Sequence, residues 1–146
     1  MYQDIKLKFQ TAQNKMIRFI LDFNSRHHLY VKDFVKAGFL SVEKRFDYLS
    51  ANMMYNIFYD KAPSYLCHFK RVDSVHSHAT RGSIMSYVLP KIKTQGKKTF
   101  MYNGAKLWNS LSVSMRSIES KDRFKKDCKK HFFSLMKNSE NSQVVQ

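Results

Sequence analysis

The sequence predicts a mainly helical α+β domain, in which amphipathic helices pack together with one small antiparallel β-hairpin. Glycine and proline are scarce, at four and two of 146 residues, whereas an all-β sandwich needs many turns. Apolar residues make up 43% of the chain and often recur at steps of three and four, the spacing of one helix face. A chain of this length and composition is sufficient for one domain with one core.

Three helices are predicted in the first half of the chain. Residues 2–23 form an amphipathic helix whose apolar stripe is Ile5, Phe9, Ala12, Met16, Phe19, Ile20 and Phe23. Residues 30–37 form a short second helix, which Gly38 can terminate. Ser41 is a suitable N-cap for a third helix over residues 42–59. The apolar stripe of this third helix consists of Val42, Phe46, Leu49, Met53 and Ile57, and we expect it to face the core.

The second half of the chain is expected to contain the hairpin. Pro63 ends the third helix and begins a short turn. After a polar loop, two short apolar runs predict strands at Ile84–Leu89 and Lys98–Tyr102, joined by a basic connector. Ser120 then caps a last helix. We expect the single folded domain to span residues 1–137.

Residues 138–146 are polar, and we expect them to form a disordered tail.

The only tryptophan, Trp108, belongs to the most informative segment, Thr99–Arg116. Here a short strand, an Asn103-Gly104 turn and one helical turn are predicted to form a packing nucleus. Trp108 has two interpretations, a core anchor or a platform on which a nucleobase stacks. Its leucine neighbours favour the core. The other residues predicted for the core are Phe46, Tyr65 and Phe124.

Positive charge is concentrated in the second half of the chain. The net charge is +15, of which residues 1–73 contribute +5 and residues 74–146 contribute +10. From Lys70 to Lys106 there are eight basic residues and a single acidic one, Asp73. Such a field concentrates polyanions, so RNA or DNA is the first candidate partner. A membrane is not expected, because no stretch combines a basic face with an exposed Trp/Leu face and no apolar run is long enough for a span.

The basic hairpin is the best candidate for a nucleic-acid-binding site. Its cations are Arg81, Lys91, Lys93, Lys97, Lys98 and Lys106, and they alternate with Tyr87, Phe100, Tyr102 and Trp108. Cations can neutralise phosphates while an aromatic ring supports a base. A solvated basic surface on a packed hairpin is the alternative. A second cationic run lies on the last helix, from Lys121 to Lys130, where a purely solvated face is an equally good interpretation.

The cysteines and histidines do not predict a metal site. Cys67-His68 and His76-x-His78 offer ligands, but their spacing fits no standard zinc pattern. No nucleophile motif and no glycine-rich phosphate loop is present, so we expect neither a cofactor nor a catalytic residue. The unpaired cysteines indicate a reducing compartment, and the N-terminal segment lacks the apolar core of a signal peptide. We therefore expect an intracellular protein, in the nucleus, the cytoplasm or both.

Four stretches, in this order, carry a resemblance to a known family. They are Phe9–Arg18, similar to "Q-x-x-Q-N-K-x-x-R"; residues 42–66, similar to "V-x-x-R-x-x-Y … A-P-x-Y-L"; residues 78–90; and residues 98–111, followed by Arg116, Ser120, Phe124, Lys125 and Lys129. Together they resemble the C-terminal region of the reverse transcriptase polyprotein of jockey-like non-LTR retrotransposons, over about residues 5–136. One departure is Ser112, where the family commonly has proline.

The resemblance implies a role without catalysis for this part of the polyprotein. A reverse transcriptase needs paired aspartates that hold two metal ions, and this sequence has no Asp-Asp pair. RNA-directed DNA polymerase activity would therefore belong to the parent polyprotein. The chain would be a nucleic-acid-binding extension beyond the polymerase thumb, with RNA or DNA and the rest of the polyprotein as its partners. Two alternatives stay open, a structural module that buttresses the thumb and a decayed remnant without function.

Overall fold

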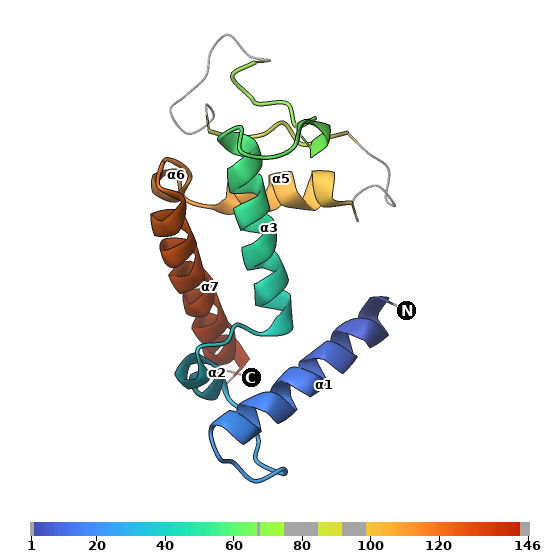
Figure 1. Cartoon of the computed structure of the whole chain (residues 1–146), viewed down its shortest axis with the longest axis vertical. Coiled ribbons are helices and arrows are strands. Elements are labelled where there is room, and N and C mark those ends of the chain that lie inside the picture. The colour runs from blue at the N-terminus through green and yellow to red at the C-terminus, as the bar shows by residue number, and fades with distance from the viewer. Residues whose placement is uncertain (1, 67, 75–84, 92–98, 144–146) are drawn as a thin grey trace. The chain divides into compact units, whose positions relative to one another are not determined.

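The computed structural model describes residues 2–66, 68–74, 85–91 and 99–143, and it is mainly helical over them (Figure 1). The elements in order are α1 (Tyr2–Ile20), α2 (Val31–Ala37), α3 (Val42–Phe58), the 3-10 turn η1 (Ser64–Leu66), α5 (Phe100–Ser110), α6 (Val113–Arg116) and α7 (Lys121–Gln143). These bounds confirm the predicted helices in the first half of the chain to within a few residues.

The chain divides into two compact units. The first consists of residues 1–48 and 129–146, and the second consists of residues 49–128. Helices α3 and α7 each contribute residues to both units. Because the division falls within two helices, it does not decide whether residues 1–137 form a single domain. That expectation stays a prediction.

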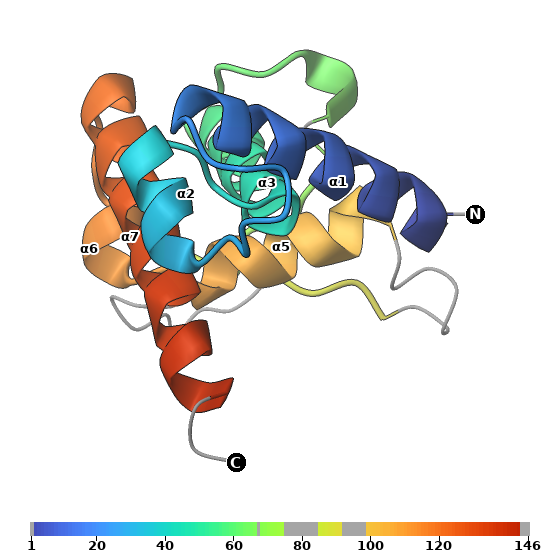
Figure 2. The ribbon, with the colours of Figure 1, turned by 90° about the horizontal axis from the view of Figure 1, so that it is seen from below.

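In the first unit, α2 follows α1 and packs against it, and both views show α2 beside the second half of α7 (Figures 1 and 2). Gly38 ends α2 with a φ of 75°, a left-handed conformation that glycine adopts without a Cβ clash. At the start of α3, Ser41 caps as predicted, because its Oγ accepts a hydrogen bond from the Lys44 N–H at 3.4 Å.

The apolar stripe of α1 is exposed. Phe19 has 86% of its surface accessible, and Ile5, Phe9, Met16 and Ile20 are also exposed. Ile17 is the fully buried residue of this helix, and the side that carries Gln10 and Gln13 is the side that bonds to the connector before α3. Periodicity identified the helix, but these amide hydrogen bonds determine which side packs.

Three of the five residues in the apolar stripe predicted for α3 are exposed instead of packed in the core. Phe46 is 48% exposed, and Leu49 and Met53 are exposed as well. Ile57, the last residue of that stripe, is buried as predicted, and the other buried residues of the helix in the second unit are Ala51, Met54, Tyr55 and Phe58. The buried side is fixed by the Tyr55 hydroxyl, which donates to the Glu119 carbonyl oxygen, and by an aromatic stack between Tyr55 and Phe124.

The core of the second unit is built around Trp108, which is fully buried. Its ring stacks on Phe58 with centroids 5.3 Å apart and also contacts Phe124 and Tyr87. Phe124 is fully buried too. Tyr65, which the sequence also assigns to the core, lies instead in η1 with 70% of its surface exposed, because the short turn after Pro63 leaves its side chain outside.

The predicted β-hairpin is not present in the described residues. Phe100–Tyr102, expected as part of a strand, form the first turn of α5, and the Asn103 N–H donates to the Thr99 carbonyl oxygen at 3.0 Å. Asn103-Gly104, expected as a turn, continues the same helix. Ile84 and Lys98, the first residues of the two predicted strands, lie outside the described residues.

An isolated antiparallel bridge between Arg71 and Tyr87 stands where the hairpin was expected. The segment from Met85 to Leu89 therefore forms backbone hydrogen bonds with residues 70–72. The run Lys98–Tyr102 is too short to separate a strand from a helix turn, and packing against α3 selects the helix for Phe100–Tyr102.

Gly104 allows α5 to cross α3 closely in the second unit. A Cβ at this position would lie 2.9 Å from the Met54 Sδ and 3.2 Å from the Phe100 ring. Gly104→Ala should gain about 1 kcal/mol of helix propensity but lose about 1–3 kcal/mol to overpacking. We expect a net loss of up to about 2 kcal/mol in urea unfolding. Asn103→Ala on the exposed side of α5 is the control, and a more stable G104A variant would contradict this close crossing.

The last helix is longer than predicted. Helix α7 continues to Gln143, so residues 138–143, expected as part of a disordered tail, are helical. The Ser139 Oγ donates to the Met136 carbonyl oxygen at 2.7 Å, which is one local interaction that a composition argument misses. The remaining three residues of the predicted tail lie outside the described part.

Candidate functional site

Two of the six predicted nucleic-acid-binding cations are described, and both are exposed. Lys91 follows the Arg71–Tyr87 bridge, and Lys106 lies on α5. Neither has an ion-pair or hydrogen-bond partner among the residues that the structure places. The other four, Arg81, Lys93, Lys97 and Lys98, lie outside the described residues, so the predicted site is seen only in part.

The backbone near these cations is held by α5. The Trp108 indole Nε1 donates to the Met85 carbonyl oxygen at 2.9 Å. The Asn109 amide forms two bonds to one residue, since its Oδ1 accepts the Tyr87 N–H at 2.9 Å and its Nδ2 donates to the Tyr87 carbonyl oxygen at 2.8 Å. Asn109 therefore takes the place of a neighbouring strand along this short extended segment.

The same segment is paired on its other side with residues 70–72. The Val72 N–H donates to the Ser86 carbonyl oxygen at 3.0 Å, and the Val88 N–H donates to the Lys70 carbonyl oxygen at 2.8 Å. Lys70 is exposed, like Lys91. Lys70, Lys91 and Lys106 are therefore exposed cations of one compact unit, and exposed cations can neutralise phosphates.

Arg116 is structural and does not contribute to this exposed charge. The side chain is only 5% exposed, and its Nη1 donates to the Met85 carbonyl oxygen at 2.9 Å and to the Ser86 Oγ at 2.6 Å. Burial lowers the pKa of Arg116, although a guanidinium stays charged at neutral pH. The Nε has no partner among the described groups. Arg116 therefore supports the extended segment from inside.

The aromatic residues predicted to alternate with the cations do not form a stacking surface. Trp108 is fully buried, which confirms its core interpretation, and Tyr87 is also buried, with 2% of its surface exposed. Phe100 and Tyr102 are half-buried. The exposed aromatic side chain in the same unit is Tyr65, which the sequence assigned to the core. Tyr65 follows Pro63-Ser64 directly, and nothing in the sequence around it indicated that its side chain would be exposed.

The second cationic run lies on α7. Arg123 pairs weakly with Asp127, with Nε and Oδ2 3.9 Å apart, and the Lys129 ammonium lies over the Phe133 ring at 5.7 Å. Lys126 and Lys130 are exposed. Charge pairing and cation–π contact thus occupy part of this run, which favours a solvated helix face here.

The described part of the chain contains no group of three or more His, Cys, Asp or Glu able to hold an ion. His68 is exposed, and Cys67, His76 and His78 lie outside the described residues. Cys128 is fully buried, and burial raises the pKa of its thiol to about 12, so the reactive thiolate is absent at neutral pH.

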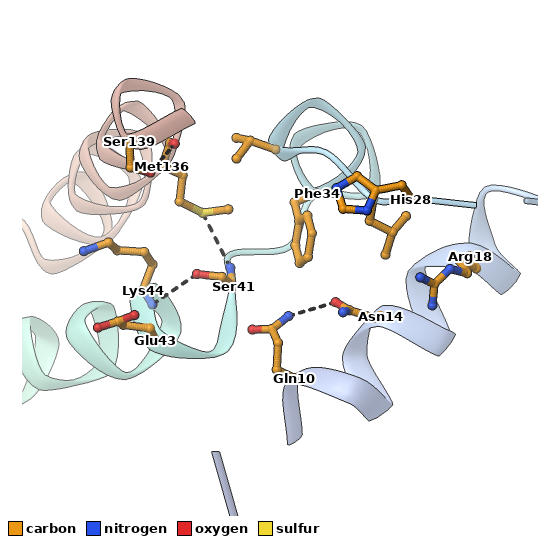
Figure 3. Close-up of a pocket in the computed structure, with 12 residues that line it drawn as sticks. Gln10, Asn14, Arg18, His28, Phe34, Ser41, Glu43, Lys44, Met136 and Ser139 are labelled. Atoms are coloured by element: carbon orange, nitrogen blue, oxygen red, sulfur yellow. Dashed lines mark hydrogen bonds between the residues drawn. The ribbon is translucent and has the colours of Figure 1, made fainter. Parts of the chain in front are cut away.

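A pocket of about 540 Å³ lies in the first unit (Figure 3). Its apolar lining consists of Leu29, Val31, Phe34 and Met136. Its polar lining comes from α1, from the connector before α2 and from the ends of α3 and α7, and consists of Gln10, Asn14, Arg18, His28, Ser41, Glu43, Lys44 and Ser139. This pocket was not predicted from the sequence.

Three amides on α1 form a hydrogen-bonded network at the pocket. Gln10 accepts the Val42 N–H at 3.0 Å, and Gln13 donates to the Leu40 carbonyl oxygen at 2.8 Å. The Gln10 Nε2 then donates to Gln13 at 3.1 Å and to Asn14 at 2.9 Å. These amides belong to the "Q-x-x-Q-N" part of the first stretch that carries the family resemblance. That motif was the one feature of the sequence that could have indicated the pocket. In the structure its amides hold α1 against the connector before α3.

No helix in the part of the chain that the structure describes has both the length and the apolar character needed to cross a membrane. No protein-family model matches the chain, and the searches of curated proteins and of solved structures gave no match.

Proposed function

We propose that this chain is a non-catalytic nucleic-acid-binding region of a non-LTR retrotransposon reverse transcriptase, and that it holds template RNA or target DNA for the polymerase. One observation carries the nucleic-acid part of the proposal. Between Lys70 and Lys106 there are eight basic residues against Asp73 alone, and the three of these lysines with described side chains are exposed. The ordered resemblance of the four stretches supports the assignment to a reverse transcriptase polyprotein.

The mode of binding that this surface supports is contact with phosphates. Exposed lysines release condensed counterions when they meet a nucleic-acid backbone, which makes affinity strongly dependent on salt. Because Tyr87 and Trp108 are buried, base stacking on them does not contribute. Phosphate contacts carry no sequence information, so RNA and DNA should bind with little base preference.

The test is a salt titration of RNA and DNA binding. Neutralising Lys91, Lys93, Lys97 and Lys98 to Gln should reduce the slope of log affinity against log salt by up to about 0.7 per lost contact for single strands and about 0.9 for duplex DNA. Thermal melting is measured alongside and is expected to stay unchanged, as is usual when lysine charges that bind a ligand are neutralised.

A matched variant controls for total charge. Replacing the exposed lysines 8, 15, 32 and 36 of the first unit with Gln changes the net charge by the same amount. This control variant should retain most of the slope of log affinity against log salt. Equal slopes for the parent and for the 91/93/97/98 variant, with unchanged melting, would remove this segment from the nucleic-acid interface.

A second candidate function, a structural module that buttresses the polymerase thumb, is favoured by the exposed apolar face of α1. Five large apolar side chains of that helix are exposed on one side, Ile5, Phe9, Met16, Phe19 and Ile20, which is typical of a surface that contacts another protein. Salt dependence separates the two functions, since a buttress requires no counterion release on adding RNA.

A further inference from the structure

The pocket of the first unit is suited to a nucleotide (Figure 3). We propose that it binds one nucleoside monophosphate group, supplied either as a free nucleotide or as one unstacked residue of a single strand. This goes beyond the proposed function, because the pocket residues belong to the first unit and the cations of that proposal belong to the second.

One wall of the pocket presents a hydrogen-bond donor whose orientation is fixed by the backbone. The Val42 N–H can only donate, so the Gln10 group that it meets must be the amide oxygen, and the Gln10 nitrogen must point to Asn14. The Asn14 Oδ1 therefore accepts from Gln10 at 2.9 Å. The Asn14 Nδ2 is left as a donor with no partner among the described residues. A ligand at this wall should bring an acceptor.

Arg18 lies one turn after Asn14 on α1 and also lines the pocket. Its Nε donates to the His27 carbonyl oxygen at 2.8 Å, which holds the side chain in place. The two terminal nitrogens have no partner in the described part of the chain. A guanidinium held in this way, with its terminal edge available, matches the oxygen atoms of a phosphate.

The remaining charges at the pocket are paired. The Glu43 carboxylate lies 3.4 Å from the Lys6 ammonium, and the Lys44 ammonium lies 3.4 Å from the Asp47 carboxylate. Arg18 is thus the cation that determines the charge of the ligand, and it favours an anion.

The apolar side of the pocket indicates which chemical group the ligand carries besides its phosphate. Leu29, Val31, Phe34 and Met136 offer a surface without charge, and a volume of about 540 Å³ exceeds what inorganic phosphate fills. A nucleobase has apolar faces and carries acceptors along its edge, where a side-chain amide binds well. A fatty acid has an anionic end but no such edge for Asn14. One nucleotide uses the donor, the cation and the apolar surface together.

The decisive variant is Asn14→Asp in the full chain. This change keeps the oxygen that accepts from Gln10 but replaces the Nδ2 donor with a carboxylate oxygen. We expect an at least tenfold loss of affinity for the four nucleoside 5′-monophosphates in an NMR titration, because a donor to the ligand is lost and a carboxylate oxygen faces the acceptor atoms of the base edge. Lys15→Gln changes the charge by the same amount at the next position, which is exposed and does not line the pocket, so it should change the affinity less than twofold.

The outcomes separate the alternatives. Binding of inorganic phosphate as tight as that of the nucleotides would overturn the proposal, and so would an equal loss for K15Q and N14D. If N14D melts several degrees below the parent, Arg18→Lys is measured in its place, with a several-fold loss of nucleotide affinity expected and an unchanged affinity overturning the proposal. Tighter binding of a pentanucleotide than of the monophosphates identifies a strand as the source, and the reverse identifies a free nucleotide.

The same variants keep this proposal distinct from the proposed function. The 91/93/97/98 lysine variant should retain its affinity for the monophosphates, whether or not it still binds long RNA. N14D should retain the salt slope of RNA binding. Loss of monophosphate binding in the lysine variant would overturn the assignment of the nucleotide to the pocket.

Discussion

Trp108→Ala should lower the free energy of unfolding by about 3–5 kcal/mol. The indole is fully buried among Phe58, Tyr87 and Phe124, so its removal leaves a cavity that these rings cannot collapse to fill. Chemical denaturation followed by circular dichroism measures the loss, because the variant has no tryptophan fluorescence. Most of this cost is lost packing, and part of it is the hydrogen bond from Nε1 to the Met85 carbonyl oxygen.

Trp108→Phe separates the two contributions. It keeps an aromatic ring in the stack and removes the donor to Met85, whose carbonyl oxygen still accepts from Arg116. We expect a smaller loss of about 1–2 kcal/mol. If W108A instead melts like the parent and loses RNA binding, Trp108 is a stacking platform and the core interpretation is wrong.

The helices of the first half were predictable from sequence because their signals are local. Ser41 and Gly38 mark helix ends through backbone chemistry that needs no tertiary information. The apolar spacing of residues 2–23 and 42–59 likewise identifies helices with bounds close to those of α1 and α3.

The packing side of each helix was not predictable, because it depends on distant partners. Gln10 and Gln13 turn the polar side of α1 toward residues 40 and 42, which leaves Phe19 at the surface. Periodicity predicts that the apolar stripe of a helix is buried in preference to a pair of amides. It contains no information about the distant backbone groups with which the amides form hydrogen bonds. The same limit explains why Phe46 and Tyr65 were wrongly assigned to the core.

The hairpin was predicted wrongly for a related reason. The residues before Gly104 alternate over too short a run, and Asn103-Gly104 has the composition of a turn. In the structure Gly104 serves the close crossing of α5 over Met54 and not a turn. The extended segment around Tyr87 does exist, but its partners are the side chain of Asn109 and residues 70–72.

Asn109→Asp tests this arrangement and should cost about 1.5–3 kcal/mol. The two side chains have the same shape, so packing is preserved. The Oδ1 can still accept the Tyr87 N–H, but the Nδ2 that donates to the Tyr87 carbonyl oxygen at 2.8 Å becomes an oxygen that repels it. A carboxylate is also harder to keep half-buried than an amide. Urea unfolding at neutral pH measures the loss.

Asn103→Asp is the matched control, because it makes the same chemical change on the exposed side of the same helix. It should change stability by less than about 0.5 kcal/mol, since a negative charge near the start of a helix is tolerated or favourable. Amide hydrogen exchange locates the effect. In N109D the Val72 and Val88 N–H groups, which form the hydrogen bonds between residues 70–72 and the Tyr87 segment, should exchange faster than in N103D. Equal stability and equal exchange in the two variants would show that Asn109 does not hold the segment from which Lys91 extends.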